Sequence, residues 1–301
     1  MFCARPAVRN TIKTKAISVG RRTIILYSFA HLLEVVGRER DIIGELMLRR
    51  SFLQAAGAAG VAGASVDSGA ARTRYYTMES LLLENGEQVG RLHDFMSHAF
   101  IPSARKVHTG PMVLLEALVA PHVPQFLVIA GFGSVTDALS LYPRLHQQEG
   151  YTAAVEKWEG GATPPYVQTA SALLEAADYS PEFPTESAKQ PRIFELRTYH
   201  SPTWRQLGAL HQRFSGREVA IFHRSGIHPL FYTSTVFGSN LPNLTYLIPF
   251  DDLAAREKAW SAFGADPEWT KVRKESVAKD GEIASVIQIS LFKATAYSPF
   301  Q

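Results

Sequence analysis

The sequence has 301 residues, a formal net charge of +3 and a single cysteine, Cys3. The excess of positive charge lies within the first 64 residues, because positions 65–301 hold 21 Lys and Arg against 24 Asp and Glu. A region with a net charge of −3 argues against a nucleic-acid binder, which needs a basic face, and a region without cysteine forms no disulfide. Its length suffices for one large domain or two of ordinary size.

The first 46 residues are basic at their start and show no convincing fold pattern. Their one apolar run, residues 23–36, is interrupted by His31 and Glu34 and is too short for a membrane-spanning helix. We interpret residues 1–46 as an over-extended gene prediction or a disordered extension. The alternative is a genuine N-terminal anchor or a transit-like segment.

Residues 47–64, MLRRSFLQAAGAAGVAGA, have the order of an export signal: two arginines, a weakly apolar stretch and a small-residue cleavage site before Ser65. The Arg-Arg-Ser-Phe-Leu core resembles the twin-arginine signal, by which bacteria export folded proteins. A buried Ala/Gly helix is the alternative, but three glycines in seven residues disfavour it. We therefore expect translation to start at Met47 and the mature protein to be periplasmic or secreted, with no stable membrane span. The signal residues are Arg49, Arg50, Phe52, Leu53, Ala62 and Ala64.

The chain aligns with itself at an offset of 118 residues. Residues 124–132 match 242–250 without a gap. Leu92-His93 matches Leu210-His211, and Tyr179-Ser-Pro181 matches Tyr297-Ser-Pro299. This common register predicts a duplication, with a first repeat at 72–183 and a second at 191–301. Residues 184–190, within a stretch rich in Pro and polar residues, are the predicted linker.

The second repeat shows the order of elements more clearly. Strand and helix periodicities alternate as β-α-β-β-α-β, the order of a ferredoxin-like unit. We therefore predict an α+β fold of two tandem ferredoxin-like units packed sheet to sheet, because each sheet covers only one face with its own helices. The expected segments are strand 194–199, helix 204–222, strands 229–237 and 244–250, helix 253–263, a helix from Pro267, and strand 285–293.

The second repeat resembles the NIPSNAP family in residues 195–199, 243–260 and 266–269 and in Gly226. The resemblance implies a dimeric α+β barrel, here with both halves in one chain. It implies no settled activity, because the wider superfamily includes cofactor-free monooxygenases, haem-degrading enzymes, isomerases and binding modules. The first repeat is similar more loosely, in Tyr75-Tyr76, Arg91-Leu92, Ile101-Pro102 and Gly110-Pro111, so that the resemblance covers about 72–301.

One strand face could carry a ligand site. Alternation places Glu195, Arg197 and Tyr199 side by side, where a guanidinium, a phenol and a carboxylate could bind an acidic ligand. The alternative is a structural network in which Arg197 pairs with Glu195 or Glu79, because buried charges need partners. The matching positions of the first repeat are Thr77, Glu79 and Leu81, so any such site is asymmetric or confined to the second repeat.

The histidines are the other candidates. His93 and His211 recur at one helical position, where an imidazole could act as an acid, a base or a ligand, or be a partly exposed structural residue. His228 lies five residues after His223 and is a haem-ligand candidate by superfamily analogy alone. Neither the histidine spacing nor the cysteine content matches a metal motif. We therefore expect no metal and no tightly bound cofactor.

Three functions fit these observations. The first is an exported module that binds a small molecule or an envelope protein. The second is a cofactor-independent monooxygenase or isomerase, or a haem-related protein. The third is a structural partner in an envelope complex, and self-association into a homodimer is compatible with all three. An enzyme should present its acid or base in a cleft, whereas a module should show a closed polar network at Glu195 and Arg197.

Overall fold

The computed structural model describes residues 72–184 and 192–301. The predicted extension, the export signal and all but one residue of the predicted linker lie outside these ranges and stay predictions. None of the helices in the described ranges has the length and apolarity needed to cross a membrane.

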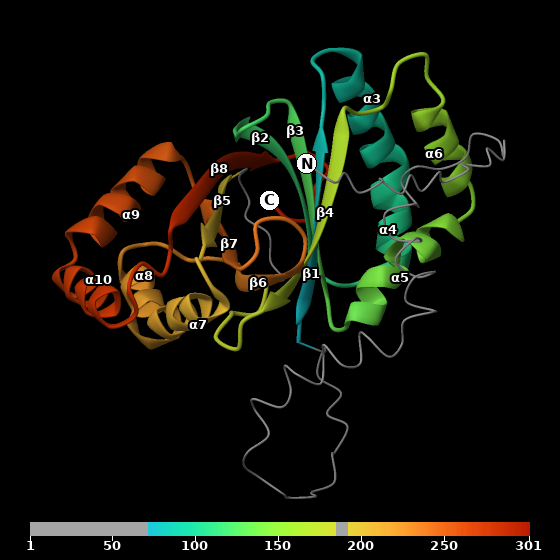
Figure 1. The fold of residues 1–301 in the computed structure, drawn as a ribbon. Coiled ribbons are helices and arrows are strands. Elements are labelled where there is room, and N and C mark those ends of the chain that lie inside the picture. The colour runs from blue at the N-terminus through green and yellow to red at the C-terminus, as the bar shows by residue number, and fades with distance from the viewer. Residues whose placement is uncertain (1–71, 185–191) are drawn as a thin grey trace, which may run out of the picture. The chain divides into compact units, whose positions relative to one another are not determined.

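Both halves of the described chain have the same order of elements, as the repeat predicts (Figure 1). In each half a long helix is interrupted by a five-residue π-helical segment, and the two π segments begin 118 residues apart. The first half contains β1 (Tyr75–Leu82), α3 (Glu87–Phe95), η1 (Met96–Phe100), α4 (Ile101–Val107), β2 (Met112–Val119), β3 (Gln125–Phe132), α5 (Val135–His146), α6 (Tyr151–Glu159) and β4 (Gln168–Ala176). The second contains β5 (Ile193–His200), α7 (Trp204–Arg213), η2 (Phe214–Glu218), α8 (Val219–Arg224), β6 (Phe231–Phe237), β7 (Asn243–Phe250), α9 (Leu253–Ala265), α10 (Pro267–Asp280) and β8 (Val286–Ala294).

The eight strands form one closed barrel in the order β1-β3-β2-β8-β5-β7-β6-β4. Each half contributes a four-stranded antiparallel sheet, and two antiparallel seams, β2–β8 and β4–β6, join the sheets. The helices of each half lie outside its own sheet (Figure 1). The predicted fold class is therefore confirmed, with the closure made by edge strands that pair across the two halves.

Strand alternation separates two cores. Phe194, Phe231 and Phe292 point into the barrel, where a stacked pair, Tyr76 and Phe231, has ring centroids 4.5 Å apart. The opposite face of the second sheet, including Tyr199 and Tyr246, packs under α7, η2, α8 and α9. Glu195, Arg197 and Tyr199 therefore share one face as predicted, and that face is the one covered by helices.

Helix caps follow the sequence pattern. The carboxylate of Asp252 accepts a hydrogen bond from the amide of Ala255 at 2.7 Å and begins α9. Asp266 accepts from the amides of Glu268 and Trp269 and begins α10, with Pro267 in its first turn. Such caps satisfy amides that have no partner within the helix. Both helix starts were predicted, whereas α9 runs two residues further than expected.

The end of each half binds the other half. The hydroxyl of Ser180, just after β4, accepts from the amide of Tyr232 on β6 at 3.0 Å. The hydroxyl of Ser298, just after β8, accepts from the amide of Leu114 on β2 at the same distance. These residues correspond at the 118-residue offset, so the two seams are related by the internal repeat. Each half is completed by the last segment of the other.

Candidate functional site

Glu195 is the centre of a closed polar network. Its carboxylate has no exposed surface and accepts a hydrogen bond from Arg197 Nη1 at 2.8 Å. The second carboxylate oxygen accepts from Arg256 Nε and from Trp260 Nε1, both on α9. The guanidinium carbon of Arg197 lies 4.0 Å from the ring centroid of Trp260, in a cation–π contact. Arg197 thus pairs with Glu195, and α9 covers the pair.

Tyr199, the third residue predicted on this face, lies outside the ion pair. Its ring packs edge to face against Phe214 and Tyr246 within the covered core. Burial raises its pKa above the usual value, which keeps the phenol neutral. The three predicted residues are therefore brought together in the fold but are not open to a ligand. The structural network that the sequence left as an alternative describes this arrangement.

Glu79 does not reach Arg197. It accepts a hydrogen bond from the hydroxyl of Tyr142 on α5, at the position that corresponds to Trp260 in the second repeat. No ion pair joins Glu79 to any residue in the described ranges. Burial raises the pKa of Glu79 to about 7, and the hydrogen bond from Tyr142 lowers it only in part. The first repeat therefore holds a carboxyl without a cation where the second holds Arg197.

The sheet–helix layer of the second half is more polar than that of the first. Glu218 is 1% exposed and accepts a hydrogen bond from Arg213 Nε at 2.7 Å. Burial raises the pKa of Glu218 to about 7, although Arg213 acts in the opposite direction. The hydroxyl of Tyr232 is buried in this layer with no hydrogen-bond partner in the described structure. Residues 118 positions earlier are apolar: Phe95, Phe100 and Leu114 replace Arg213, Glu218 and Tyr232.

Sequence reasoning missed this second polar cluster. Arg213 and Glu218 are five residues apart, a spacing that an α-helix does not align, and the π-helical segment η2 begins after Arg213 and ends at Glu218. Comparing the two repeats position by position would have found the signal, because charged residues in one copy stand where phenylalanines stand in the other.

The recurring histidines lie at the two seams. His211 accepts or donates at both nitrogens, with Nδ1 2.9 Å from the hydroxyl of Tyr179 and Nε2 2.7 Å from the hydroxyl of Ser234. His93 has its Nδ1 2.7 Å from the hydroxyl of Tyr297, and its Nε2 is 3.4 Å from Glu116. Each histidine therefore binds the tyrosine of the segment that crosses from the other half.

The two histidine sites differ in charge. Burial lowers the pKa of His211 to about 4, so its imidazole is neutral at pH 7. Glu116, which corresponds to Ser234, also lies 3.3 Å from the ammonium of Lys293. The first seam is thus an ionic cluster and the second a chain of neutral hydrogen bonds. Both join the halves, which supports the structural interpretation of the two histidines.

His228, the haem-ligand candidate, lies on the surface beside His223. It is exposed, and its ring stacks on that of His223 with a centroid separation of 5.2 Å. Burial, with His228 acting in the same direction, lowers the pKa of His223. Among the described residues, no group of three or more His, Cys, Asp or Glu side chains is placed to hold a metal ion.

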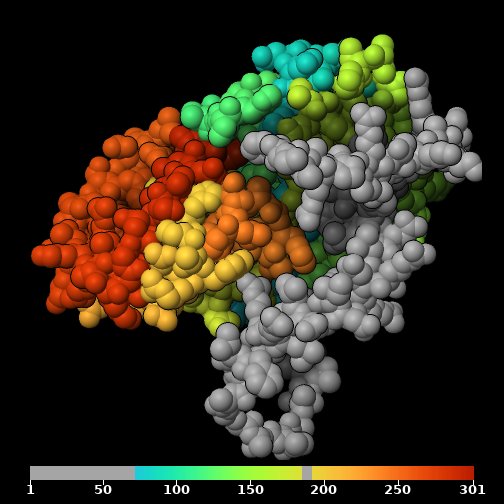
Figure 2. Space-filling view, viewed as in Figure 1, coloured from blue at the N-terminus to red at the C-terminus, as the bar shows by residue number. Residues whose placement is uncertain are grey.

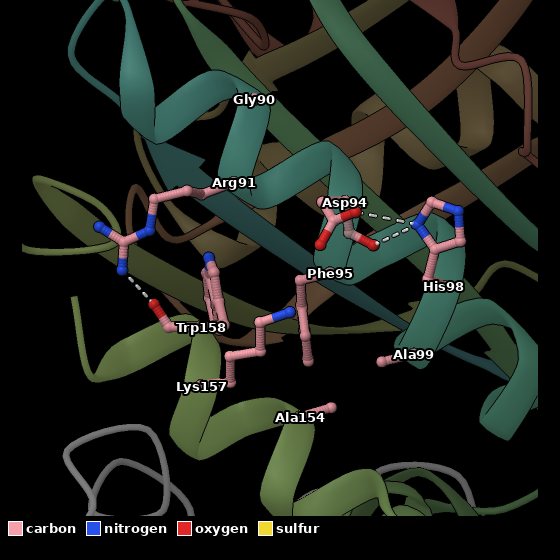
Figure 3. Close-up of a pocket in the computed structure, with 9 residues that line it drawn as sticks. All are labelled: Gly90, Arg91, Asp94, Phe95, His98, Ala99, Ala154, Lys157 and Trp158. Atoms are coloured by element: carbon pink, nitrogen blue, oxygen red, sulfur yellow. Dashed lines mark hydrogen bonds and ion pairs between the residues drawn. The ribbon is translucent and has the colours of Figure 1, made fainter.

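An open groove of about 460 Å³ lies on the first half, between α3 with η1 and α6 (Figure 3). Its floor is the stacked pair Phe95 and Trp158, whose rings are nearly parallel with centroids 4.6 Å apart. Small residues leave space above this floor, and a side chain built on Gly90 would meet nothing within 4 Å. The groove is lined by Gly90, Arg91, Asp94, Phe95, His98, Ala99, Ala154, Lys157 and Trp158.

The rim of the groove is polar. Asp94 and His98 form a pair one helical turn apart, with 3.1 Å between the carboxylate and Nδ1. Lys157 is exposed and makes no ion pair with any described residue. Trp158 is only 6% exposed, and its indole nitrogen is buried without a hydrogen-bond partner in the described structure. The groove therefore offers an aromatic floor with an exposed cation, Lys157, at its rim.

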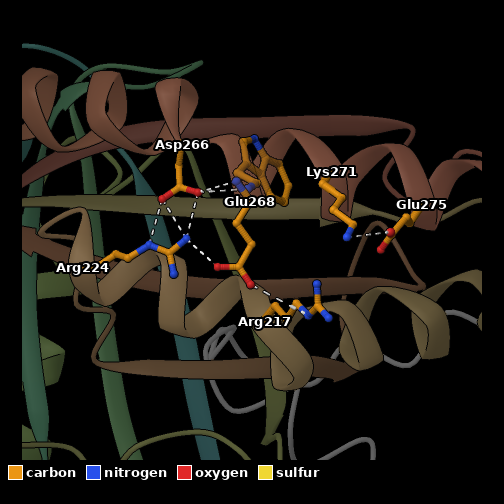
Figure 4. A network of polar contacts seen from close by, with 7 residues as sticks. Arg217, Arg224, Asp266, Glu268, Lys271 and Glu275 are labelled. Carbon is orange, nitrogen blue, oxygen red and sulfur yellow. Dashed lines mark hydrogen bonds and ion pairs between the residues drawn. The ribbon is translucent and has the colours of Figure 1, made fainter.

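The second half closes the corresponding surface. Arg213, at the position of Phe95, extends over Trp269 with 5.1 Å between guanidinium carbon and ring centroid, and its Nη1 is 3.4 Å from the hydroxyl of Ser276. Nearby, Arg224 binds Asp266 and Glu268 at 2.8 Å and ties α8 to α10 (Figure 4). The groove is thus a feature of the first half that the internal repeat does not require.

Comparison with known proteins finds a family model that matches the second repeat. The family model described as NIPSNAP matches residues 194–299. No curated protein matches the sequence. A NIPSNAP-like domain protein from Burkholderia xenovorans is 24% identical over 36% of this chain and 89% of its own, with a TM-score of 0.31.

Longer structural matches are weaker in sequence. An anthrone oxidase-like protein is 13% identical over 76% of this chain and 94% of its own, with a TM-score of 0.48. A mutant chlorite dismutase from Candidatus Nitrospira defluvii is 9% identical over 75% of this chain and 92% of its own, with a TM-score of 0.43. At such identities and TM-scores the likeness does not extend to activity.

Proposed function

We propose that this protein, whose second repeat is a NIPSNAP domain, is a binding module that holds a small planar molecule in the groove of its first repeat. The observation that carries the proposal is the stacked aromatic pair Phe95 and Trp158 beneath an open groove, with the exposed Lys157 at its rim, in a position that the second repeat closes with Arg213.

The lining defines the chemistry of the ligand. The rings of Phe95 and Trp158 favour a flat apolar or aromatic body. The exposed ammonium of Lys157 favours an anionic group at the rim. An aromatic carboxylate has both features. The closed network around Glu195 supports a module as well, because the charged residues of that strand contact each other and α9 rather than a cleft.

The test is a fluorescence titration with 1-naphthoate as the probe. We expect saturable binding to one site, weakened at least about tenfold by Ala154→Leu, which places a larger side chain in the groove. Lys157→Met should weaken binding of naphthoate but not of naphthalene. Gly208→Leu, at the position in the second repeat that matches Gly90, is the control and should bind as the wild type does. Equal binding by the Ala154→Leu variant would contradict the proposal.

A cofactor-independent oxygenase or isomerase is the second candidate, and His211 is the observation in its favour. Its neutral imidazole is partly exposed and hydrogen-bonded to Ser234, so it could accept a proton. A pKa of about 4 makes it a weak base at neutral pH, which favours the binding module. Turnover of an aromatic substrate that disappears in His211→Gln, with the fold intact by circular dichroism, would favour the enzyme instead.

We also propose that the module is exported through the twin-arginine route. The support is the sequence of residues 47–64, with Arg49 and Arg50 before the apolar stretch. A chain that begins at Met47 should still be exported, and the double variant Arg49→Lys, Arg50→Lys should stay in the cytoplasm. Cell fractionation and immunoblotting measure export. Export of the double variant at the wild-type level would overturn this proposal.

A further inference from the structure

The N-terminal half of β8 has one edge without a partner strand in the described structure. β8 pairs with β5 from Val286 to Lys293. Its pairing with β2 begins only at Leu291. The segment Val286–Ser290 therefore presents backbone amides and carbonyls on its free side, and a free strand edge is a template for pairing with another strand. Figure 2 shows the dark red end of the chain, which includes β8, reaching the surface beside the green turn between β2 and β3.

The side chains of this free segment are unusually apolar for an exposed edge. Val286, Ile287 and Ile289 are 53%, 46% and 43% exposed. The corresponding free segment of β4, 118 residues earlier, carries Gln168, Thr169, Ala170 and Ser171. That segment also pairs on one side only, since β6 meets β4 from Leu173 on. The two free edges have the same geometry, and only the second combines it with β-branched apolar residues.

Natural edge strands are usually protected by charged residues, proline or a covering element. Val286–Ser290 contains neither a charge nor a proline. On the neighbouring strand β5, Ile287 pairs with Tyr199 and Ile289 pairs with Arg197. Ile287 and Ile289 therefore lie on the same face of the sheet as Tyr199 and Arg197. Their exposure shows that the helices covering the centre of the sheet do not extend over this edge. The edge is therefore apolar, uncharged and unprotected by any described residue.

We propose that this edge pairs antiparallel with the same segment of a second copy of the chain. With Gln288 at the two-fold axis, Ile287 of one copy lies opposite Ile289 of the other, on one face of the sheet. Such opposed β-branched pairs stabilise antiparallel strands. The register also places the two Gln288 side chains together, where their amides can hydrogen-bond.

A second copy is the occupant that these observations favour. The segment is close to symmetric about Gln288, so it is complementary to itself in the antiparallel sense, as a two-fold interface requires. The lack of charge means that two copies meet without repulsion. The chain already uses antiparallel edge pairing at both of its seams. The C-terminal part of β8, from Leu291 on, forms one of these seams with β2. The proposed contact continues that pairing beyond the end of β2.

The first test is the mass of the full chain in solution. Sedimentation equilibrium at about 50 µM should give a dimer, because an unprotected strand edge is a template for pairing with another strand. Ile287→Lys and Ile289→Lys should each weaken dimerisation at least about tenfold, since edge lysines prevent strand pairing. Thr169→Lys and Ser171→Lys, at the matching positions of β4, are the controls and should leave the dimer intact.

The second test does not depend on a charged substitution being tolerated. Gln288→Cys in a Cys3→Ser background should form an intermolecular disulfide on oxidation, because opposed residues of antiparallel strands have Cβ atoms about 5 Å apart. Ala170→Cys, the matching position on β4, should not. A monomeric wild type, or equal cross-linking at both positions, would overturn the proposal. A dimer that survives Ile287→Lys and Ile289→Lys would do the same.

Discussion

The buried carboxylate of Glu195 on β5 and the half-buried carboxyl of Glu79 on β1 should respond in opposite ways to neutralisation. Glu195 has no exposed surface and is bound by two guanidinium groups and an indole N–H. Glu195→Gln keeps the shape but removes the charge, and its amide donor would face the donors of Arg197 or Arg256. Breaking a buried ion pair in this way costs about 3–5 kcal/mol. Because the side chain of Arg256 is 20% exposed and water can solvate it, we expect the lower end, about 3 kcal/mol.

Neutralising Glu79 should instead raise the stability of the fold at high pH. Its pKa rises from 4.5 to about 7 in the folded state, because burial disfavours the charged form. A raised carboxyl pKa stabilises the fold below pH 4.5, and that contribution is lost as the pH rises through 7. The shift corresponds to about 3 kcal/mol. Glu79→Gln, which can still accept the hydrogen bond from Tyr142, should therefore match the wild type at pH 4.5 and exceed its stability at pH 8.

Urea denaturation followed by circular dichroism at pH 4.5 and pH 8 measures both effects. Comparing each variant with the wild type at the same pH cancels the contribution of Glu218, whose pKa is also raised. The expected result at pH 8 is a loss of unfolding free energy for Glu195→Gln and a gain for Glu79→Gln. If both variants lose stability by the same amount at both pH values, the assignment of one paired and one unpaired carboxyl is wrong.

Three further predictions test other parts of the structure. His211→Gln should flatten the fall in stability between pH 6.5 and pH 4, because a lowered histidine pKa gives stability above 6.5 that is lost on acidification; thermal unfolding across that range measures it. Gly110→Ala should destabilise the fold by about 1–3 kcal/mol, since the new methyl would lie 2.2 Å from the carbonyl oxygen of Gly131. Gly208→Ala meets open space and should stabilise the fold by up to about 1 kcal/mol. Equal melting temperatures of the two variants would contradict this. Cleavage at Lys189 should give halves that stay paired or aggregate, because each seam needs both; a monodisperse monomeric half by sedimentation velocity would contradict the barrel.

The fold class could be predicted from the sequence because the internal repeat shows the same order of strand and helix patterns twice. The helix starts expected at residue 253 and at Pro267 are those of α9 and α10, and alternation in residues 194–199 assigned the two faces of β5 correctly. Periodicity alone could not say that the sheets join at their edges. That closure depends on β2–β8 and β4–β6 pairs between residues far apart in sequence, and no local pattern encodes a partner at such a distance.

The candidate site was harder to predict for a physical reason. Glu195 and Arg197 were found because strand alternation reports which residues share a face. Their partners Arg256 and Trp260 come from a helix that packs over the strand, and this packing is set by tertiary contacts. The groove depends on what is missing, since small residues such as Gly90 and Ala154 leave space only once α3 and α6 lie side by side. A ligand-binding role for these residues has no motif in the sequence.

Because the segments after β4 and β8 cross to the other half, the first half cannot complete its fold until the end of the chain has been translated. The first half needs β8, Tyr297 and Ser298 to complete its seam, and these residues are made last. At the usual 5–20 residues per second, a ribosome takes about 6–24 s to make the 118 residues that separate the two ends. During that interval β2 leaves the ribosome with an open edge beside a buried face that is not yet covered. A chaperone that recognises exposed strands would meet this protein at that stage, and a ribosome stalled before residue 286 would hold the first half in that state.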